Sequence, residues 1–203
     1  MLSTLQISAD QISDLDGILT TCFDAQHIAV RAECLLALGQ FAAALADFNL
    51  AMEMSPEDAK PYASRAVLYI RTGQYANAFE DLDKQIELAP DDAMGYSNRG
   101  ALFIMTNNSA RAVADLERAI ELDANCAPAY INLGEIYFKS DRIESAITYL
   151  NQAIELFPSS GEAHYYRGKA YEALGMLSQS QVDLDRACQL GHVPGAIESF
   201  FRS

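Results

Sequence analysis

Residues 127–160 read APAYINLGEIYFKSDRIESAITYLNQAIELFPSS, and the pattern of this 34-residue stretch recurs along the chain. Counting by 34 residues in both directions gives five contiguous units without an insertion: 25–58, 59–92, 93–126, 127–160 and 161–194. Repeats of this length are typical of solenoids, in which each unit buries its apolar face against its neighbours. The chain is therefore expected to be an array of similar units.

Two columns of the repeat contain small residues and one contains large residues. The eighth residues are Ala32, Ala66, Gly100, Gly134 and Gly168. The twentieth are Ala44, Ala78, Ala112, Ala146 and Ser180. The twenty-fourth are Phe48, Leu82, Leu116, Leu150 and Leu184. Small residues set against large ones in a fixed register are what two closely packed helices require.

Turn signals fall at fixed positions within each unit. The fifteenth residues, all tolerant of a left-handed backbone, are Gly39, Gly73, Asn107, Asp141 and Gly175. Three units also carry a proline at position thirty-two, where a second helix would stop, namely Pro56, Pro90 and Pro158. Each unit is thus predicted to be a first helix (helix A), a tight turn, a second helix (helix B) and another turn.

These columns resemble the tetratricopeptide repeat family over residues 25–194. The resemblance implies an all-α fold, a right-handed superhelical α-solenoid of antiparallel helix pairs, with the A helices lining a concave groove. We expect one domain of five units, with an N-terminal capping helix in residues 1–24 and a C-terminal capping helix in 195–203. Gln85, the one large residue in the twenty-seventh column, is expected to loosen the packing between the second and third units.

Positions seven and twenty-three vary together within this one chain. Four units carry Arg at position seven and Asp at position twenty-three: Arg31 with Asp47, Arg65 with Asp81, Arg99 with Asp115, and Arg167 with Asp183. The fourth unit replaces both at once, with Leu133 and Tyr149. We infer a structural ion pair between helices A and B of each of the four units, since pairing with the next unit would leave Asp115 opposite Leu133.

Composition and motifs exclude several function classes. The net charge of −14 argues against nucleic-acid binding, and no stretch is long and apolar enough to span a membrane. The N-terminal residues lack the pattern of a signal peptide, so a cytoplasmic location is expected. The four cysteines form no CxxC pair, and His27, His164 and His192 occupy unrelated repeat positions. We therefore expect no cofactor, no metal site and no catalytic activity.

The resemblance to the family places position six of each helix A in the groove. These residues are Ser64, Asn98, Asn132 and Tyr166. The consecutive asparagines resemble the asparagine ladder with which members of the family hold a peptide backbone, because an amide offers both a donor and an acceptor. The alternative is that Asn98 and Asn132 only solvate or cap a helix.

Position twelve adds an apolar row, and other groove positions add charge. The apolar row is Leu36, Ile70, Ile104 and Phe138. This apolar row either contacts an apolar segment of a partner or is covered by the chain itself. Groove cations are Lys60, Arg71, Lys139 and Lys169, and groove anions are Glu33, Glu135, Glu162 and Glu172, so the expected groove is electrically balanced. The cations that clamp a terminal carboxylate in co-chaperones of the family are absent from the matching positions.

The sequence thus predicts a non-catalytic protein–protein interaction module that binds an unidentified protein or peptide segment in the groove. Two alternatives stay open at this point. One is a chaperone dedicated to a single client protein, and the other is a structural protein that associates with itself as a homo-oligomer.

Overall fold

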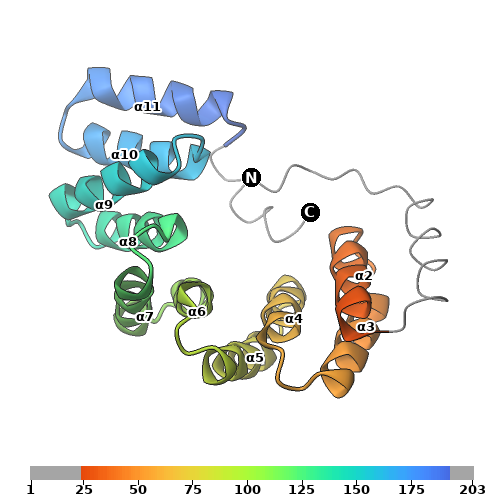
Figure 1. The fold of residues 1–203 in the computed structure, drawn as a ribbon. Helices are drawn as coiled ribbons and strands as arrows, with labels where there is room; N and C mark the ends of the chain where they lie inside the picture. Colours follow the sequence, from red (N-terminus) through yellow and green to blue (C-terminus); the bar gives the residue numbers. More distant parts are fainter. Residues whose placement is uncertain (1–23, 193–203) are drawn as a thin grey trace. The chain divides into compact units, whose positions relative to one another are not determined.

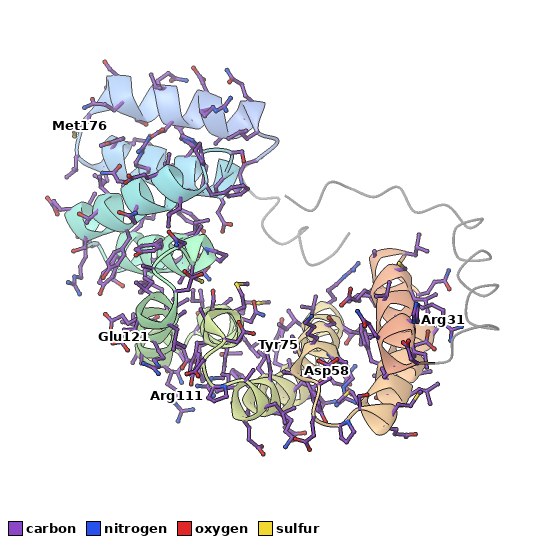
Figure 2. All side chains as sticks on the ribbon, viewed as in Figure 1. Arg31, Asp58, Tyr75, Arg111, Glu121 and Met176 are labelled. Carbon is purple, nitrogen blue, oxygen red and sulfur yellow. The ribbon has the colours of Figure 1, made fainter. Side chains whose placement is uncertain are left out.

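The computed structural model describes residues 24–192, and within this range the regular elements are ten α-helices joined by short turns (Figure 1). The A helices are α2 (Ala25–Ala37), α4 (Ala59–Arg71), α6 (Ala93–Met105), α8 (Ala127–Lys139) and α10 (Gly161–Ala173). The B helices are α3 (Phe41–Met54), α5 (Tyr75–Leu88), α7 (Ser109–Leu122), α9 (Ile143–Leu156) and α11 (Leu177–Gln189). The expected all-α class is confirmed. The capping helices expected in 1–24 and 195–203 lie outside the described residues, apart from Asp24.

The chain divides into two compact units, with the boundary between Pro90 and Asp91. In its described part the first unit contains α2 to α5, and the second contains α6 to α11. The boundary follows the repeat that carries Gln85, which is buried in α5 at a position where the other four repeats have alanine. The grouping of all five repeats into one domain stays a prediction.

Each A helix ends in a left-handed residue at repeat position fifteen. The φ angles there are 75° at Gly39, 74° at Gly73, 59° at Asn107, 59° at Asp141 and 73° at Gly175. The reversed backbone lets the N–H groups of this residue and of the next one satisfy carbonyls of the last helical turn, as where Asp141 donates to Phe138 O at 3.1 Å and Arg142 to Tyr137 O at 2.9 Å. The turn chemistry read from the sequence is therefore present at every repeat.

The two helices of a repeat approach most closely where the small and large columns meet. A Cβ atom built on Gly134 would lie 2.5 Å from Leu150 Cγ, and one on Gly100 would lie 2.8 Å from Leu116 Cγ. Both leucines are fully buried. Glycine at position eight thus allows a contact that a larger residue would block, and this contact fixes the rotation of helix A about its axis.

Successive repeats of the second unit share their cores. One cluster joins α6, α7 and α8 through residues such as Leu116, Ala129 and Leu133, all fully buried. A second joins α8, α9 and α10 through Ile131, Leu150 and Ala163. Because α6 packs against α8 and α8 against α10, the three A helices of this unit lie side by side.

Candidate functional site

The packing of Gly100, Gly134 and Gly168 shows which side of each A helix in the second unit faces its B helix and which side faces away. Each glycine faces its own B helix. Position six lies two residues earlier, about 200° around the helix, so it points away from the B helices. We call this side the A-helix face of the second unit. Its residues are Met94, Asn98, Ile104, Met105, Pro128, Ile131, Asn132, Glu135, Phe138, Lys139, Glu162, Tyr165, Tyr166, Lys169 and Glu172.

Asn98 and Asn132 are half-buried on this face, and their side-chain amides have no hydrogen-bond partner among the described residues. The two other position-six residues are engaged. Ser64, in the first unit, donates its hydroxyl to Glu33 Oε1 at 2.8 Å. Tyr166 is only 5% exposed, with ring centroids 6.2 Å from Phe138 and 5.4 Å from Tyr165. The two asparagines are therefore the position-six residues that keep free hydrogen-bonding capacity.

The apolar row at position twelve is divided between core and surface. Leu36 is 7% exposed and packs in the core of the first unit, and Ile70 is 8% exposed. Ile104 and Phe138, in the second unit, are half-buried. Met94 and Met105 extend the apolar surface of α6, with 43% and 38% exposure. Only the second unit thus offers position-twelve side chains for contact with a partner.

Three of the cations predicted to line the groove form ion pairs or hydrogen bonds within the chain. Lys139 Nζ lies 2.5 Å from Glu135 Oε1, and Lys169 pairs with Glu172 one turn away. In the first unit, Arg71 Nη1 donates to Leu36 O at 2.8 Å, and its guanidinium lies over the Phe41 ring. Equal numbers of positive and negative groups, as counted from the sequence, therefore do not show which of these groups are already paired.

Glu162 is the acidic residue of this face without an ion pair or hydrogen bond among the described residues. The pKa of its carboxyl is raised to about 7, mainly by burial and also by the charge of Glu135, while the charge of Lys139 opposes the shift. Burial likewise raises the pKa of the Tyr166 phenol, with added contributions from the charge of Glu135 and from a hydrogen bond to that carboxylate. Glu135, Glu162 and Tyr166 thus share one partly dehydrated region between α8 and α10.

The four Arg–Asp pairs lie between helices A and B, and each pair is bidentate within its own repeat. The Nε atoms of Arg31, Arg65, Arg99 and Arg167 donate to Asp47, Asp81, Asp115 and Asp183 at 2.6 to 2.8 Å. In the fourth repeat Leu133 is fully buried, and the Tyr149 ring stacks on Tyr137 with centroids 5.2 Å apart. These side chains connect the helices of a repeat and lie away from the A-helix face.

Two of these arginines have a second role that was not predicted from the sequence. Arg65 Nη1 donates to Asn49 Oδ1 at 2.5 Å, and Arg167 Nη1 donates to Asn151 Oδ1 at 2.8 Å. Both asparagines occupy position twenty-five of the preceding repeat, so these arginines also connect neighbouring repeats. The sequence does contain a sign of these contacts, because in both cases an Asn at position twenty-five of one repeat is followed by an Arg at position seven of the next repeat.

The three histidines lie in structural settings. His27 contacts the helix-capping residue Asp24, with Nδ1 2.8 Å from Oδ1. His164 Nδ1 lies 2.8 Å from Asp183 Oδ1, and its Nε2 lies 3.2 Å from Pro158 O, where Tyr62 makes the equivalent contact to Pro56 O. His192 packs on Tyr165 with ring centroids 4.9 Å apart. No group of three potential metal ligands occurs within residues 24–192.

A shallow hollow of about 400 Å³ lies away from the A-helix face, lined by α10 and α11. His164, Arg167 and Asp183 line it, so it borders the ion pair of the fifth repeat. None of the described helices has the length and apolar character needed to cross a bilayer.

Family comparisons follow the register of the first three repeats and also cover parts of the fourth and fifth. Models described as tetratricopeptide repeat match residues 29–58, 59–92 and 95–126, and a model described as TPR repeat matches 135–175. The chain belongs to the tetratricopeptide repeat family. Tetratricopeptide repeats are typically protein-interaction modules rather than catalysts. No curated protein matches the sequence of this tetratricopeptide repeat chain.

Solved structures share the same fold. The crystal structure of MamA is 24% identical, with a TM-score of 0.64, and the match covers 79% of this chain and 94% of MamA. YrrB, described as a TPR protein with an unusual peptide-binding site, is 19% identical over 93% of this chain and 97% of its own, with a TM-score of 0.61. A chain of the Cut9–Hcn1 complex reaches a TM-score of 0.82 at 16% identity, covering 89% of this tetratricopeptide repeat chain but 36% of its own.

Proposed function

We propose that this protein is a non-catalytic interaction module that binds an extended or helical segment of a partner protein on the A-helix face of the second unit. The observation that carries the proposal is the pair of unpartnered amides of Asn98 and Asn132 at the same position of neighbouring helices. A side-chain amide can accept from a backbone N–H and donate to a backbone C=O, so two amides in a row suit an extended chain.

The apolar surroundings of these amides support the same proposal. Met94, Met105 and the half-buried Ile104 and Phe138 supply adaptable contact surface on both sides of the asparagine row. Interfaces of this kind combine a few polar anchors with apolar contact. YrrB, which shares the fold, is described as having a peptide-binding site. A dissociation constant in the micromolar range, about −8 kcal/mol, is expected for one short segment.

The experiment compares Asn98→Ala/Asn132→Ala with wild type. A partner is captured from the source cell, identified and purified, and its affinity is measured by calorimetry. Loss of hydrogen bonds to two amides is expected to weaken binding by about 2 kcal/mol, roughly 30-fold, at unchanged melting temperature. Asn77→Ala/Asn125→Ala is the matched control, because these two asparagines lie on α5 and in the turn after α7. Equal affinity of the A-helix-face variant and the control would refute the proposal.

Self-association is a second candidate, and one observation favours it. Helix α11, the last described helix, exposes Leu177 and Val182 to 68% and 69%. Two large apolar side chains exposed on one helix are a potential contact surface for another copy of the chain. Sedimentation velocity of wild type and of Leu177→Ser/Val182→Ser over a hundredfold concentration range tests this. A wild-type sedimentation coefficient that equals the monomer value at every concentration excludes it.

For location we propose the cytoplasm, in keeping with the free thiols of Cys34, Cys126 and Cys188 in the described part of the chain. Fractionation of the source cell with an antibody against the chain tests this, and recovery in a membrane or secreted fraction would contradict it.

A further inference from the structure

The charges on the A-helix face of the second unit are not equally available to a partner. Both lysines, Lys139 and Lys169, already form ion pairs with glutamates on their own helices. Glu162, in the first turn of α10, has no such pair among the described residues. The face therefore presents an uncompensated carboxyl and no uncompensated cation.

Glu162 lies in surroundings that favour an organic cation over water. The side chain is half-buried, so its carboxyl is partly dehydrated, and Glu135 adds a second negative charge nearby. Tyr165, half-buried, and Phe138 belong to the same aromatic group around Tyr166. A carboxylate bordered by aromatic rings suits the ammonium group of Lys or the guanidinium of Arg, because the rings attract the cation and cover its alkyl chain.

We propose that the A-helix face selects a protein segment that carries a Lys or Arg side chain, anchored at Glu162, beside the stretch of backbone held by Asn98 and Asn132. This inference rests on the proposed function and names the chemistry of the partner. A segment that offers a carboxylate at this point is disfavoured, since it would add a third negative charge to a partly dehydrated region.

The proposal implies a pH dependence with a defined sign. The carboxyl of Glu162, whose pKa is raised to about 7, is largely protonated at pH 6 and ionised at pH 8. A bound cation favours the ionised form, so affinity rises with pH across this window. The groups that act on Glu162 are Glu135 and Lys139 on α8 and Tyr166 on α10. His192, whose pKa is lowered by burial, borders Tyr165.

The test uses a phage-displayed library of random 12-residue peptides, selected at pH 8 on the full chain. Selected peptides are synthesised twice, once as found and once with each Lys or Arg replaced by acetyl-lysine or citrulline, which remove the charge. Dissociation constants are measured by calorimetry at pH 6 and pH 8 for four proteins. These are wild type, Glu162→Gln, Glu155→Gln and Asn98→Ala/Asn132→Ala. Glu155 is the matched control, since it is an exposed glutamate on the B helix α9, outside the A-helix face.

The expected result is that removing the charge of one basic residue weakens binding to wild type at least tenfold at pH 8. Glu162→Gln should lose the same factor and its pH dependence, while Glu155→Gln behaves as wild type. The peptide pair tests the inference on the unaltered protein, independently of how the variants fold. Peptides that bind through Asn98 and Asn132 but need no basic residue would overturn the inference and leave the proposed function standing. Failure to select any peptide would overturn both.

Discussion

Replacing Arg65 and Asp81 singly and together tests the ion pair between helices A and B. Arg65 Nε and Nη2 donate to Asp81 Oδ2 and Oδ1 at 2.8 and 2.6 Å, and Asp81 is only 4% exposed. Removing one partner of a buried pair typically costs about 3–5 kcal/mol. Because the Arg65 side chain keeps 19% exposure, we expect about 2–4 kcal/mol for Arg65→Leu and a similar loss for Asp81→Tyr.

The double substitution is expected to recover most of this loss, because the fourth repeat already carries leucine and tyrosine at the same two positions. There Leu133 and Tyr149 replace the pair, and Tyr149 lies 5.2 Å from Tyr137 and 6.4 Å from Tyr130 between ring centroids. The second repeat carries tyrosines at the same two positions, Tyr62 and Tyr69. A tyrosine at position 81 therefore finds the same two rings, and Arg65→Leu/Asp81→Tyr should lie within about 1 kcal/mol of wild type.

Urea unfolding followed by far-ultraviolet circular dichroism measures the three variants. Both midpoint and slope are compared, since repeat proteins can unfold in more than one step. Lys84→Ala, which breaks the exposed pair with Glu87, is the control and should leave the midpoint unchanged. A double variant as unstable as the sum of the two single variants would refute the reasoning, because it would show that positions seven and twenty-three are not coupled.

Three further predictions follow from burial and charge. Glu162→Gln raises the free energy of unfolding by up to about 3 kcal/mol at pH 8, because the raised pKa of about 7 makes ionisation of the native carboxyl costly. In urea titrations this gain shrinks below pH 7 and vanishes near pH 4; a gain that is the same at every pH contradicts it. Although burial opposes ionisation, hydrogen bonds from Arg167 and His164 hold the pKa of Asp183 below its usual value, so its stabilisation is present above about pH 4 and lost in acid. Acid titration should show Asp183→Asn less stable than wild type at pH 7 and the gap closing below pH 4, and a constant gap would count against this. Leu150→Ala, at a site with no exposure, should cost about 3 kcal/mol in urea unfolding, and a loss below about 1 kcal/mol would mean that the cavity closes.

The sequence predicted those features that depend on backbone geometry and on side chains within one repeat. The left-handed residues at position fifteen, the contact of Gly134 with Leu150, and the Arg–Asp pairs all belong to this kind. Each follows from steric or charge rules that act over a few residues or across one helix pair, so the same pattern recurs from repeat to repeat in register.

Features that depend on neighbouring helices were harder to predict. A helical wheel places Leu36 and Phe138 on the same side of helix A, yet Leu36 is buried by packing with Leu68 while Phe138 is half-buried. Counting charges suggested a balanced groove, but the count could not tell which carboxyl lacks a partner. Glu135 is paired through its i,i+4 spacing to Lys139, and Glu162 is not. Such differences arise from rotamers and from the adjacent repeat, which one repeat's sequence does not specify.

The most direct measurement of partner recognition is a nuclear magnetic resonance titration of the isotope-labelled chain with a selected peptide. The side-chain NH2 signals of Asn98 and Asn132 are assigned from the spectra of their alanine variants, with Asn77 and Asn125 as internal references. If the A-helix face of the second unit holds the partner's backbone, the first two signals shift and become protected from solvent exchange while the references stay in place. Saturating binding that leaves the signals of Asn98 and Asn132 unmoved would contradict the proposed site.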